Sequence, residues 1–235
     1  MRLDKFLAEA TGMTRSQASK VLRQGVVTVN DKMEKSASAQ VSAEDLIQLD
    51  GETLAWYDEG QYIMLNKPQG YVCSTDERDY PSVLQFFDYP LAGKLHCAGR
   101  LDVDTTGLVL LTDDGQWSHR ITSPKHHCEK TYLVTLADPI EEHYAQAFQE
   151  GILLRGEKTP TQPAILEIID DYQANLTLTE GRYHQVKRMF GALGNKVIGL
   201  HRWRIGDVIL DESLEEGEWR ELDAQERKIG EPISK

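Results

Sequence analysis

Residues 99–107 read Gly-Arg-Leu-Asp-Val-Asp-Thr-Thr-Gly, the most unusual stretch of the chain. The charged residues Arg100, Asp102 and Asp104 alternate with apolar ones, as in an extended segment whose residues i and i+2 share one face. The Arg100 guanidinium would then lie beside the Asp102 carboxylate. A carboxylate positioned in this way can serve as a nucleophile or a base. The same pattern also fits an exposed strand edge with an ordinary ion pair, so the residues alone leave both interpretations open.

The segments on either side of this stretch predict the fold class. Most apolar runs are short and strand-like, helical patterns are fewer, and strands do not alternate strictly with helices. The sequence contains neither a G-x-G-x-x-G nor a Walker loop. These features predict an α+β domain with a mixed, mostly antiparallel sheet. The expected strands are 62–65, 108–111, 130–136, 163–169, 175–179 and 208–210, and the expected helices are 116–122, 140–149 and 182–193.

The first 55 residues have the pattern of a smaller unit of their own. Apolar residues at helical spacing begin at Leu3, and Gly12 is well placed to end that helix. The segment from Thr14 to Gln17 has the pattern of a capping box, which opens a second helix. Short strands are expected at 26–29 and 45–49.

A polar, glycine-containing segment at 57–61 is the candidate linker between two domains. The chain has 235 residues, a length that allows one or two domains. We therefore predict a small α/β domain over 1–58 and a larger domain over 59–235.

Charge is distributed unevenly along the chain. The whole sequence has a net charge of −12, which by itself argues against a simple basic nucleic-acid binder. Residues 1–40, however, hold seven basic and four acidic residues, and residues 180–204 hold six basic residues and one acidic. Residues 205–235 hold ten acidic and four basic residues. Because exposed charges are screened beyond about 8 Å at physiological salt, the two basic segments remain candidate phosphate-binding surfaces.

The basic residues of the first segment lie mostly outside the apolar stripes of its two predicted helices. Such residues form either a solvated face or a surface for phosphates, and the pattern alone favours neither. They are Arg2, Lys5, Arg15, Lys20 and Arg23.

The predicted helix after Glu180 has two different faces. Its apolar residues recur at i, i+3, i+4 and i+7 from Val186 and predict a buried stripe. His184, Lys187 and Arg188 lie on another face. A basic stripe beside a helix start suits a phosphate or a carboxylate partner, and a solvated basic face is the competing interpretation.

Several classes of protein and site are not supported by the sequence. The charged N-terminus lacks the apolar run of a signal peptide, and no window approaches the roughly 18 consecutive apolar residues that span a membrane. Cys73, Cys97 and Cys128 form no C-x-x-C pair, which is typical of reduced thiols. The histidine and cysteine spacings do not match zinc sites. We therefore expect a cytoplasmic protein without a membrane partner or a bound metal.

Three motifs resemble those of bacterial pseudouridine synthases of the RsuA type. The first is Asn66-Lys67-Pro68-Gln69-Gly70-Tyr71-Val72-Cys73-Ser74, the second runs from Gly99 to Gly107 and on to Asp113-Asp114-Gly115, and the third spans Glu180 to Phe190. The first 55 residues resemble the RNA-binding module of ribosomal protein S4. The resemblance implies an S4-like domain followed by a catalytic domain with a central cleft. Residues 118–132 look particularly similar to the family member that modifies 16S rRNA.

The resemblance also implies a reaction and the residues that perform it. Uridine in RNA is isomerised to pseudouridine, without a cofactor or a metal. The resemblance places the catalytic carboxylate at Asp102, an aromatic partner at Tyr132, and a basic partner at Lys187, where many relatives have arginine. Leu200 matches an apolar residue that lines the pocket. A covalent adduct of Asp102 and a glycal intermediate are both compatible with the sequence.

The remaining expected contacts concern RNA. Arg100 is hypothesised to fill the stack that a flipped nucleotide leaves, and the other substrate-binding candidates are Asn66, Lys67 and Arg182. The RNA-binding candidates are Arg2, Lys5, Arg15, Lys20, Arg23 and Arg188. The expected partner of this monomer is 16S rRNA or a small-subunit assembly intermediate. The alternatives are a 23S rRNA pseudouridine synthase and a non-catalytic RNA-binding assembly factor.

Overall fold

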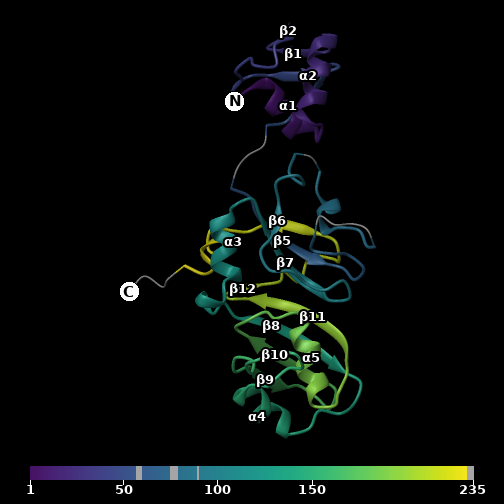
Figure 1. Cartoon of the computed structure of the whole chain (residues 1–235), viewed down its shortest axis with the longest axis vertical. Helices are drawn as coiled ribbons and strands as arrows, with labels where there is room; N and C mark the ends of the chain where they lie inside the picture. Colours follow the sequence, from purple (N-terminus) through teal and green to yellow (C-terminus); the bar gives the residue numbers. More distant parts are fainter. Residues whose placement is uncertain (57–59, 75–78, 89, 232–235) are drawn as a thin grey trace. The chain divides into compact units, whose positions relative to one another are not determined.

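The computed structural model describes residues 1–56, 60–74, 79–88 and 90–231 (Figure 1). The chain folds into two compact units. The first comprises Met1–Gly60 and Leu84–Leu95, and the second comprises Gln61–Val83 and His96–Lys235. The predicted domain boundary between residues 58 and 59 lies outside the described residues.

The first unit contains two helices and a small antiparallel sheet. The predicted capping box is confirmed, since the Thr14 hydroxyl accepts a hydrogen bond from the Gln17 N–H and the Gln17 side chain accepts one from the Thr14 N–H. Gly12 and Gly25 end the helices in the left-handed conformation at φ values of 75° and 78°. Apolar residues of both helices and of the sheet form one core. The elements are α1 (Leu3–Thr11), α2 (Arg15–Gln24), β1 (Val27–Val29), β2 (Lys32–Met33), β3 (Ile47–Leu49) and β4 (Glu52–Thr53), and the sheet order is β2-β1-β3-β4.

The second unit is built on one nine-stranded sheet. Its order is β13-β5-β7-β11-β8-β10-β9, with β12 paired to β11 and β6 to β7. All of these pairs are antiparallel except β7 with β11. The strands are β5 (Tyr62–Lys67), β6 (His96–Cys97), β7 (Thr106–Thr112), β8 (Lys130–Leu136), β9 (Ile165–Ile168), β10 (Gln173–Leu178), β11 (Val197–Ile205), β12 (Val208–Ile209) and β13 (Trp219–Glu221). The predicted α+β class with a mixed, mostly antiparallel sheet is confirmed.

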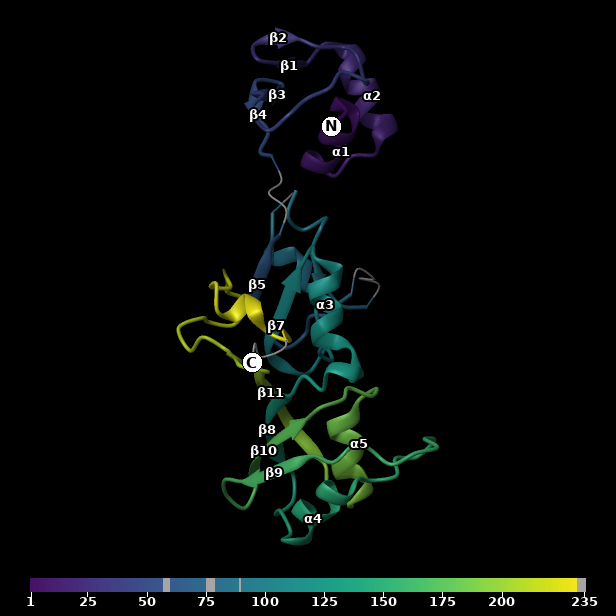
Figure 2. The ribbon, with the colours of Figure 1, turned by 90° about the vertical axis from the view of Figure 1, so that its left-hand side faces the viewer.

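Among the described residues, helices pack against the sheet in at least two hydrophobic cores. One core joins β5, β7 and α3 (Gly115–Thr122) to the C-terminal segment, and its largest side chain is Trp117. The other joins β8, β9 and β10 to α4 (His143–Glu150) and α5 (Gln185–Ala192). Figure 2 shows α3 beside β7 and α5 beside β8 and β11. Within the described part of the chain, no helix is long and apolar enough to cross a membrane. Short 3-10 helices lie at Val83–Phe86, Pro124–His126 and Glu226–Lys228.

One prediction about backbone conformation was wrong, and one long strand was not predicted. Residues 99–105 do not form an extended strand, because the Thr105 N–H donates to the Asp102 carbonyl at 3.1 Å and closes a turn. The long strand β11, which passes between β7 and β8, was not predicted. The loop at 99–105 therefore enters β7 next to the middle of β11, where His201 pairs with Thr106.

Candidate active site

The loop that carries Asp102 leads into β7 where the backbones of β7 and β11 lie very close together. Gly107 has a φ of 100°, a conformation that residues with a side chain rarely adopt. A Cβ atom at this position would lie 2.3 Å from the Arg202 carbonyl oxygen and 2.9 Å from the His201 ring. Only glycine permits β7 to begin this close to β11. The position of the loop thus depends directly on the pairing of these two strands.

Two fully buried cations hold the loop through hydrogen bonds to backbone carbonyls. The Lys67 ammonium donates to the Thr105, Pro68 and Val103 carbonyls at 2.7, 3.0 and 3.4 Å. Burial lowers the pKa of Lys67 below its usual value. The Arg202 guanidinium donates to the Gly99 and Leu108 carbonyls, each at 2.9 Å. Because these carbonyls lie before, within and after the turn, the loop has little freedom to move.

Asp102 lies between two side chains from the start of α5. Lys187 Nζ is 3.4 Å from Asp102 Oδ2, and His184 Nε2 is 3.4 Å from Asp102 Oδ1. Lys187 also donates to Asp104 Oδ1 at 2.5 Å. Partial burial by itself would raise the pKa of Asp104, but the hydrogen bond and charge of Lys187 outweigh it and hold that pKa below its usual value. The site therefore contains a partly exposed carboxylate at the meeting point of the loop and α5.

One pocket brings most of the predicted catalytic and substrate-binding residues together. The predicted residues that line it are Arg100, Asp102, Tyr132, Arg182, Lys187 and Leu200. Residues that sequence reasoning had not assigned to the site also line it, namely Leu101, Thr105, Leu178, Glu180, Gly181, His184, Gln185 and Val186. The Tyr132 hydroxyl is 3.5 Å from Arg202 Nη1. The pocket thus combines a carboxylate, an ammonium, a phenol and apolar walls.

The other predicted substrate contacts have structural partners. Lys67 is fully buried, and Asn66 is 9% exposed and donates to the Leu214 carbonyl. Arg182 lines the pocket, but its side chain donates to the Thr159 and Pro160 carbonyls and to Glu180. These contacts hold the segment around Pro160 against the start of α5.

Arg188 lies apart from the pocket lining. Its guanidinium donates to the Glu157 carboxylate at 3.0 Å and to the Tyr183 and Arg155 carbonyls at 3.0 and 2.9 Å. The predicted basic stripe is therefore divided, because His184 and Lys187 lie at Asp102 while Arg188 holds the backbone that precedes α5.

The predicted RNA-binding residues of the first unit lie on the exposed sides of α1 and α2. The buried Asp4 carboxylate receives hydrogen bonds from Arg2 and Arg15 and so orients both guanidinium groups. The hydrogen bond from Arg2, together with Arg15, lowers the pKa of Asp4 to about 2. Lys20 and Arg23 are exposed on α2. Their binding to RNA stays a prediction.

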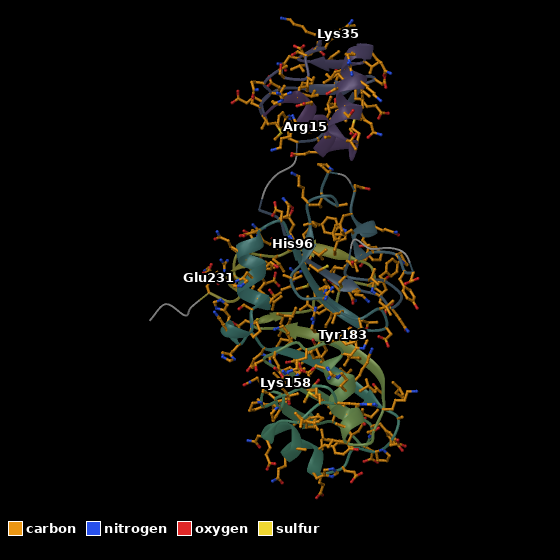
Figure 3. The ribbon with its side chains drawn as sticks, in the orientation of Figure 1. Arg15, Lys35, His96, Lys158, Tyr183 and Glu231 are labelled. Atoms are coloured by element: carbon orange, nitrogen blue, oxygen red, sulfur yellow. The ribbon has the colours of Figure 1, made fainter. Side chains whose placement is uncertain are left out.

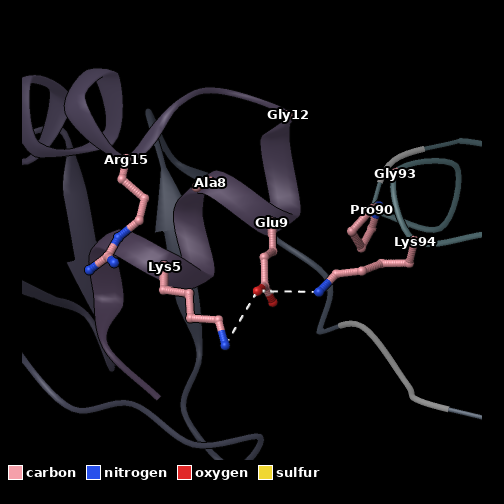
Figure 4. A pocket seen from close by; sticks show the side chains of 8 residues that line it. All are labelled: Lys5, Ala8, Glu9, Gly12, Arg15, Pro90, Gly93 and Lys94. Carbon is pink, nitrogen blue, oxygen red and sulfur yellow. Dashed lines mark ion pairs between the residues drawn. The ribbon is translucent and has the colours of Figure 1, made fainter. Parts of the chain in front are cut away.

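A second pocket lies in the first unit, between α1, α2 and the segment Leu84–Leu95 (Figure 4). It is lined by the cations Lys5, Arg15 and Lys94 and by a single carboxylate, Glu9. Glu9 Oε1 lies 3.6 Å from the Lys5 ammonium and 3.2 Å from the Lys94 ammonium. The pocket therefore has an excess of positive charge.

Two thiols lie close to the loop. The Leu101 N–H donates to the Cys73 sulfur at 3.4 Å. A hydrogen bond from the Cys97 thiol, with the Leu101 N–H and the nearby charges of Arg202 and Lys67, lowers the pKa of Cys73 below its usual range. Among the described residues, no group of three or more His, Cys, Asp or Glu side chains is placed to hold a metal ion.

His184 is the contact of Asp102 that the sequence-based site missed. Its place on the same face as Lys187 was visible in the helical spacing, and that signal could have included it. The left-handed backbone of His184, at φ 47° and ψ 38°, could not be read from the sequence. This conformation turns the chain into α5, which begins at the next residue, Gln185.

Comparison with known proteins places these motifs in a family. Residues 61–192 match the family model described as RNA pseudouridylate synthase, and residues 1–47 match the S4 domain. The chain is 74% identical over 226 residues to ribosomal small subunit pseudouridine synthase A of Haemophilus influenzae, with 96% of this chain and 97% of that protein covered. It is 56% identical over 226 residues to the protein of the same name from Escherichia coli strain K12, with 96% and 98% covered.

A solved structure is similar over nearly the whole chain. It is described as a crystal structure of pseudouridylate synthase, and it is 72% identical in sequence with a TM-score of 0.72. The similarity covers 98% of this chain and 99% of the other. A similar fold is thus found together with a similar sequence in a solved structure.

Proposed function

The chain belongs to the RNA pseudouridylate synthase family, and on this premise we propose that Asp102 is the catalytic carboxylate for isomerising one uridine of small-subunit rRNA. In this reaction the N1–C1′ bond of the uridine breaks, the uracil rotates, and a C5–C1′ bond forms. C5 loses its proton and N1 gains one, so the composition of the nucleotide is unchanged. The reaction requires a group that acts on the sugar or on the base of the uridine, and groups that hold the uracil while it rotates.

One observation supports this proposal above all: an ammonium and an imidazole both contact a single, partly exposed carboxylate. Asp102 has 30% of its side chain exposed and is contacted by Lys187 and His184. Its backbone lies on a loop held by two buried cations, which fits the need of a catalytic group for a fixed position. A carboxylate that served only as a surface ion pair would not require this degree of support.

Roles for the other pocket residues follow from their chemistry. Lys187 supplies positive charge beside the carboxylate as a point charge, whereas an arginine would supply a two-pronged fork. Tyr132 offers a ring on which uracil can stack and a hydroxyl that can take part in proton transfer. Leu200 contributes an apolar wall.

We propose that the target nucleotide is flipped into this pocket. A base inside a duplex cannot be reached by an enzyme, and extrusion costs a few kcal/mol. Arg100 is exposed, lies two residues before Asp102 and lines the pocket. It is therefore the side chain that we propose enters the base stack in place of the flipped uridine. Phosphate contacts by basic side chains offset the cost of extrusion.

We further propose that residues 1–58 form the RNA-binding domain and residues 59–235 the catalytic domain. The exposed basic side chains of α1 and α2 support the first assignment, since they lie outside the core of that unit. The Asp102 pocket supports the second, because all of its lining residues belong to the second unit. The S4-domain match at residues 1–47 also supports the assignment of RNA binding to the first domain.

The substrate is tested with transcripts labelled with tritium at uridine C5, because isomerisation releases that tritium. The wild-type protein is incubated with 16S rRNA, 23S rRNA and small-subunit assembly intermediates. We expect release from a small-subunit substrate equivalent to one uridine per RNA, and none from 23S rRNA. Equal release from 23S rRNA would contradict the assignment to the small subunit, and no release from any RNA would contradict the proposed activity.

A further inference from the structure

Tyr183 and His184 form a stacked aromatic pair that leads outward from the Asp102 pocket. Their ring centroids are 3.8 Å apart and their planes differ by 22°. His184 lines the pocket and contacts Asp102, whereas Tyr183, which is labelled in Figure 3, does not line the pocket and lies in the turn before α5. The two rings are therefore in stacking contact.

The exposure of Tyr183 is unusually large for an aromatic residue. Its relative exposure is 76%, the highest among the exposed large apolar residues that the structure describes. Single exposed apolar residues are common and need no ligand. Tyr183 differs from such residues in how its backbone is held and in the aromatic ring that lies next to it.

The backbone on both sides of Tyr183 is fixed by hydrogen bonds. The Arg188 guanidinium donates to the Tyr183 carbonyl at 3.0 Å. The Arg182 N–H donates to the Gln185 side chain at 2.8 Å, and the Gln185 N–H donates to the Arg182 carbonyl at 3.1 Å. The exposed ring is thus carried by an ordered turn, and less conformational entropy is lost when a ligand orders it.

Strain is also stored at this turn. His184 has a side chain and yet adopts φ 47° and ψ 38°, in the left-handed region. Non-glycine residues held in this region concentrate at functional sites. The strained conformation accompanies the placement of the His184 ring between Asp102 and Tyr183. A simple helix start would not require it.

We propose that Tyr183 is a stacking platform for a base of the RNA strand next to the target uridine. Proteins recognise unpaired RNA by stacking bases on aromatic side chains, and any of the four bases has a face suited to this contact. When the target uridine enters the pocket at Asp102, an unpaired base next to it in the strand comes close to the outer ring of the pair. This inference rests on the proposed function, because it requires the uridine to bind at Asp102.

The platform is tested by combining a protein substitution with the removal of single bases. Tyr183→Ala and Tyr183→Phe are prepared beside Tyr172→Ala, which alters an exposed tyrosine outside the pocket. The substrate is a 16S rRNA fragment that contains the target uridine. In two further RNAs, the nucleotide on its 5′ side or on its 3′ side is replaced by an abasic residue. The Kd of each RNA and the kcat for tritium release are measured.

We expect Tyr183→Ala to raise the Kd by about 5- to 150-fold, the range expected for loss of one stacked base, with kcat changed less than about twofold. Tyr183→Phe and Tyr172→Ala should keep the Kd of the wild type. An abasic residue at one of the two neighbouring positions should weaken wild-type binding by the same factor as Tyr183→Ala. For Tyr183→Ala, the Kd of this abasic RNA should be no higher than the Kd of the intact RNA.

Two results would overturn the platform. One is an unchanged Kd for Tyr183→Ala, and the other is a loss of affinity that is independent of both neighbouring bases. A failure of the proposed function is a distinct result, since it would appear as no tritium release by the wild-type protein from any small-subunit RNA. Thermal unfolding of each variant confirms that an altered Kd belongs to the folded protein.

Discussion

Lys187 donates its shortest hydrogen bond to Asp104, at 2.5 Å, and lies at 3.4 Å from the proposed catalytic carboxylate of Asp102. The Asp104 side chain is 52% exposed, and exposed ion pairs contribute little to stability, about 0–1 kcal/mol. Asp104 is therefore better understood as a residue that positions the ammonium than as one that stabilises the fold. The Lys187 ammonium thus lies beside Asp102, while its shorter ion pair is with Asp104.

Removal of the ammonium should slow the reaction. Lys187→Met keeps the length of the side chain but eliminates the charge beside Asp102. A charge-assisted contact is worth about 1.5–3 kcal/mol, so we expect kcat to fall by about 10- to 150-fold. Lys187→Arg should retain most of the activity, because the charge remains.

Tritium release under saturating RNA measures this effect, and Lys196→Met is the matched control at an exposed lysine. The account of Lys187 fails if Lys187→Met releases tritium as fast as Lys196→Met does.

The buried ammonium of Lys67 should support the loop and thus the stability of the second unit. Lys67→Met leaves the Thr105, Pro68 and Val103 carbonyls without this donor. We expect the free energy of unfolding to fall by about 1.5–3 kcal/mol, measured by urea denaturation. Lys158→Met, at an exposed position, should change it by less than about 0.5 kcal/mol. Equal stabilities of the two variants would refute this role.

Gly107 should tolerate no side chain. Gly107→Ala brings a Cβ to 2.3 Å from the Arg202 carbonyl and requires a φ of 100°, so we expect a loss of about 3 kcal/mol or more in unfolding free energy, or failure to fold. Gly191→Ala, within α5 and with open space around its Cβ, should stabilise the protein by about 0.5–1 kcal/mol. Chemical denaturation of both variants checks the pair, and a stable Gly107→Ala protein would show that β7 and β11 can separate.

The Asp4 carboxylate should make stability depend on pH. Its pKa is lowered from 3.8 to about 2 by the hydrogen bond from Arg2 and by Arg15. A lowered pKa means that the folded state favours the ionised form, so this stabilisation is fully present above about pH 4 and is lost as the pH falls towards about 2. Asp4→Asn should remove that part of the dependence.

Urea unfolding of both proteins across this pH range tests the prediction. The stability difference between them should shrink as the pH falls from about 4 to about 2. A constant difference would mean that the Asp4 carboxylate does not keep its partners in the folded state.

Much of the fold follows from local sequence patterns. Strand β8 and helix α3 were predicted at nearly their observed bounds, because their apolar residues have regular spacing and their ends have clear turn or cap residues. Asp114, for example, accepts hydrogen bonds from the Gln116 and Trp117 N–H groups at the start of α3. Strand β11 was missed because it contains Arg202 and Arg204 and because register shifts interrupt its alternation.

The site was predicted in part for similar reasons. The pocket residues Asp102, Tyr132 and Lys187 were identified through the resemblance to pseudouridine synthases, and the structure brings them together. The burial of Lys67 could not be predicted, because it depends on three carbonyls that tertiary folding delivers. The turn at Asp102 also depends on tertiary contacts, since the alternating residues by themselves favour an extended chain.

The central claim is that Asp102 performs the chemistry, and Asp102→Asn tests it most directly. The variant keeps the shape of the side chain but removes the carboxylate, so RNA binding should persist while tritium release from C5-labelled 16S rRNA falls below detection. Asp207→Asn, at an exposed aspartate next to Gly206, is the matched control and should release tritium at the wild-type rate. Release by Asp102→Asn at a rate close to that of the control would contradict the account.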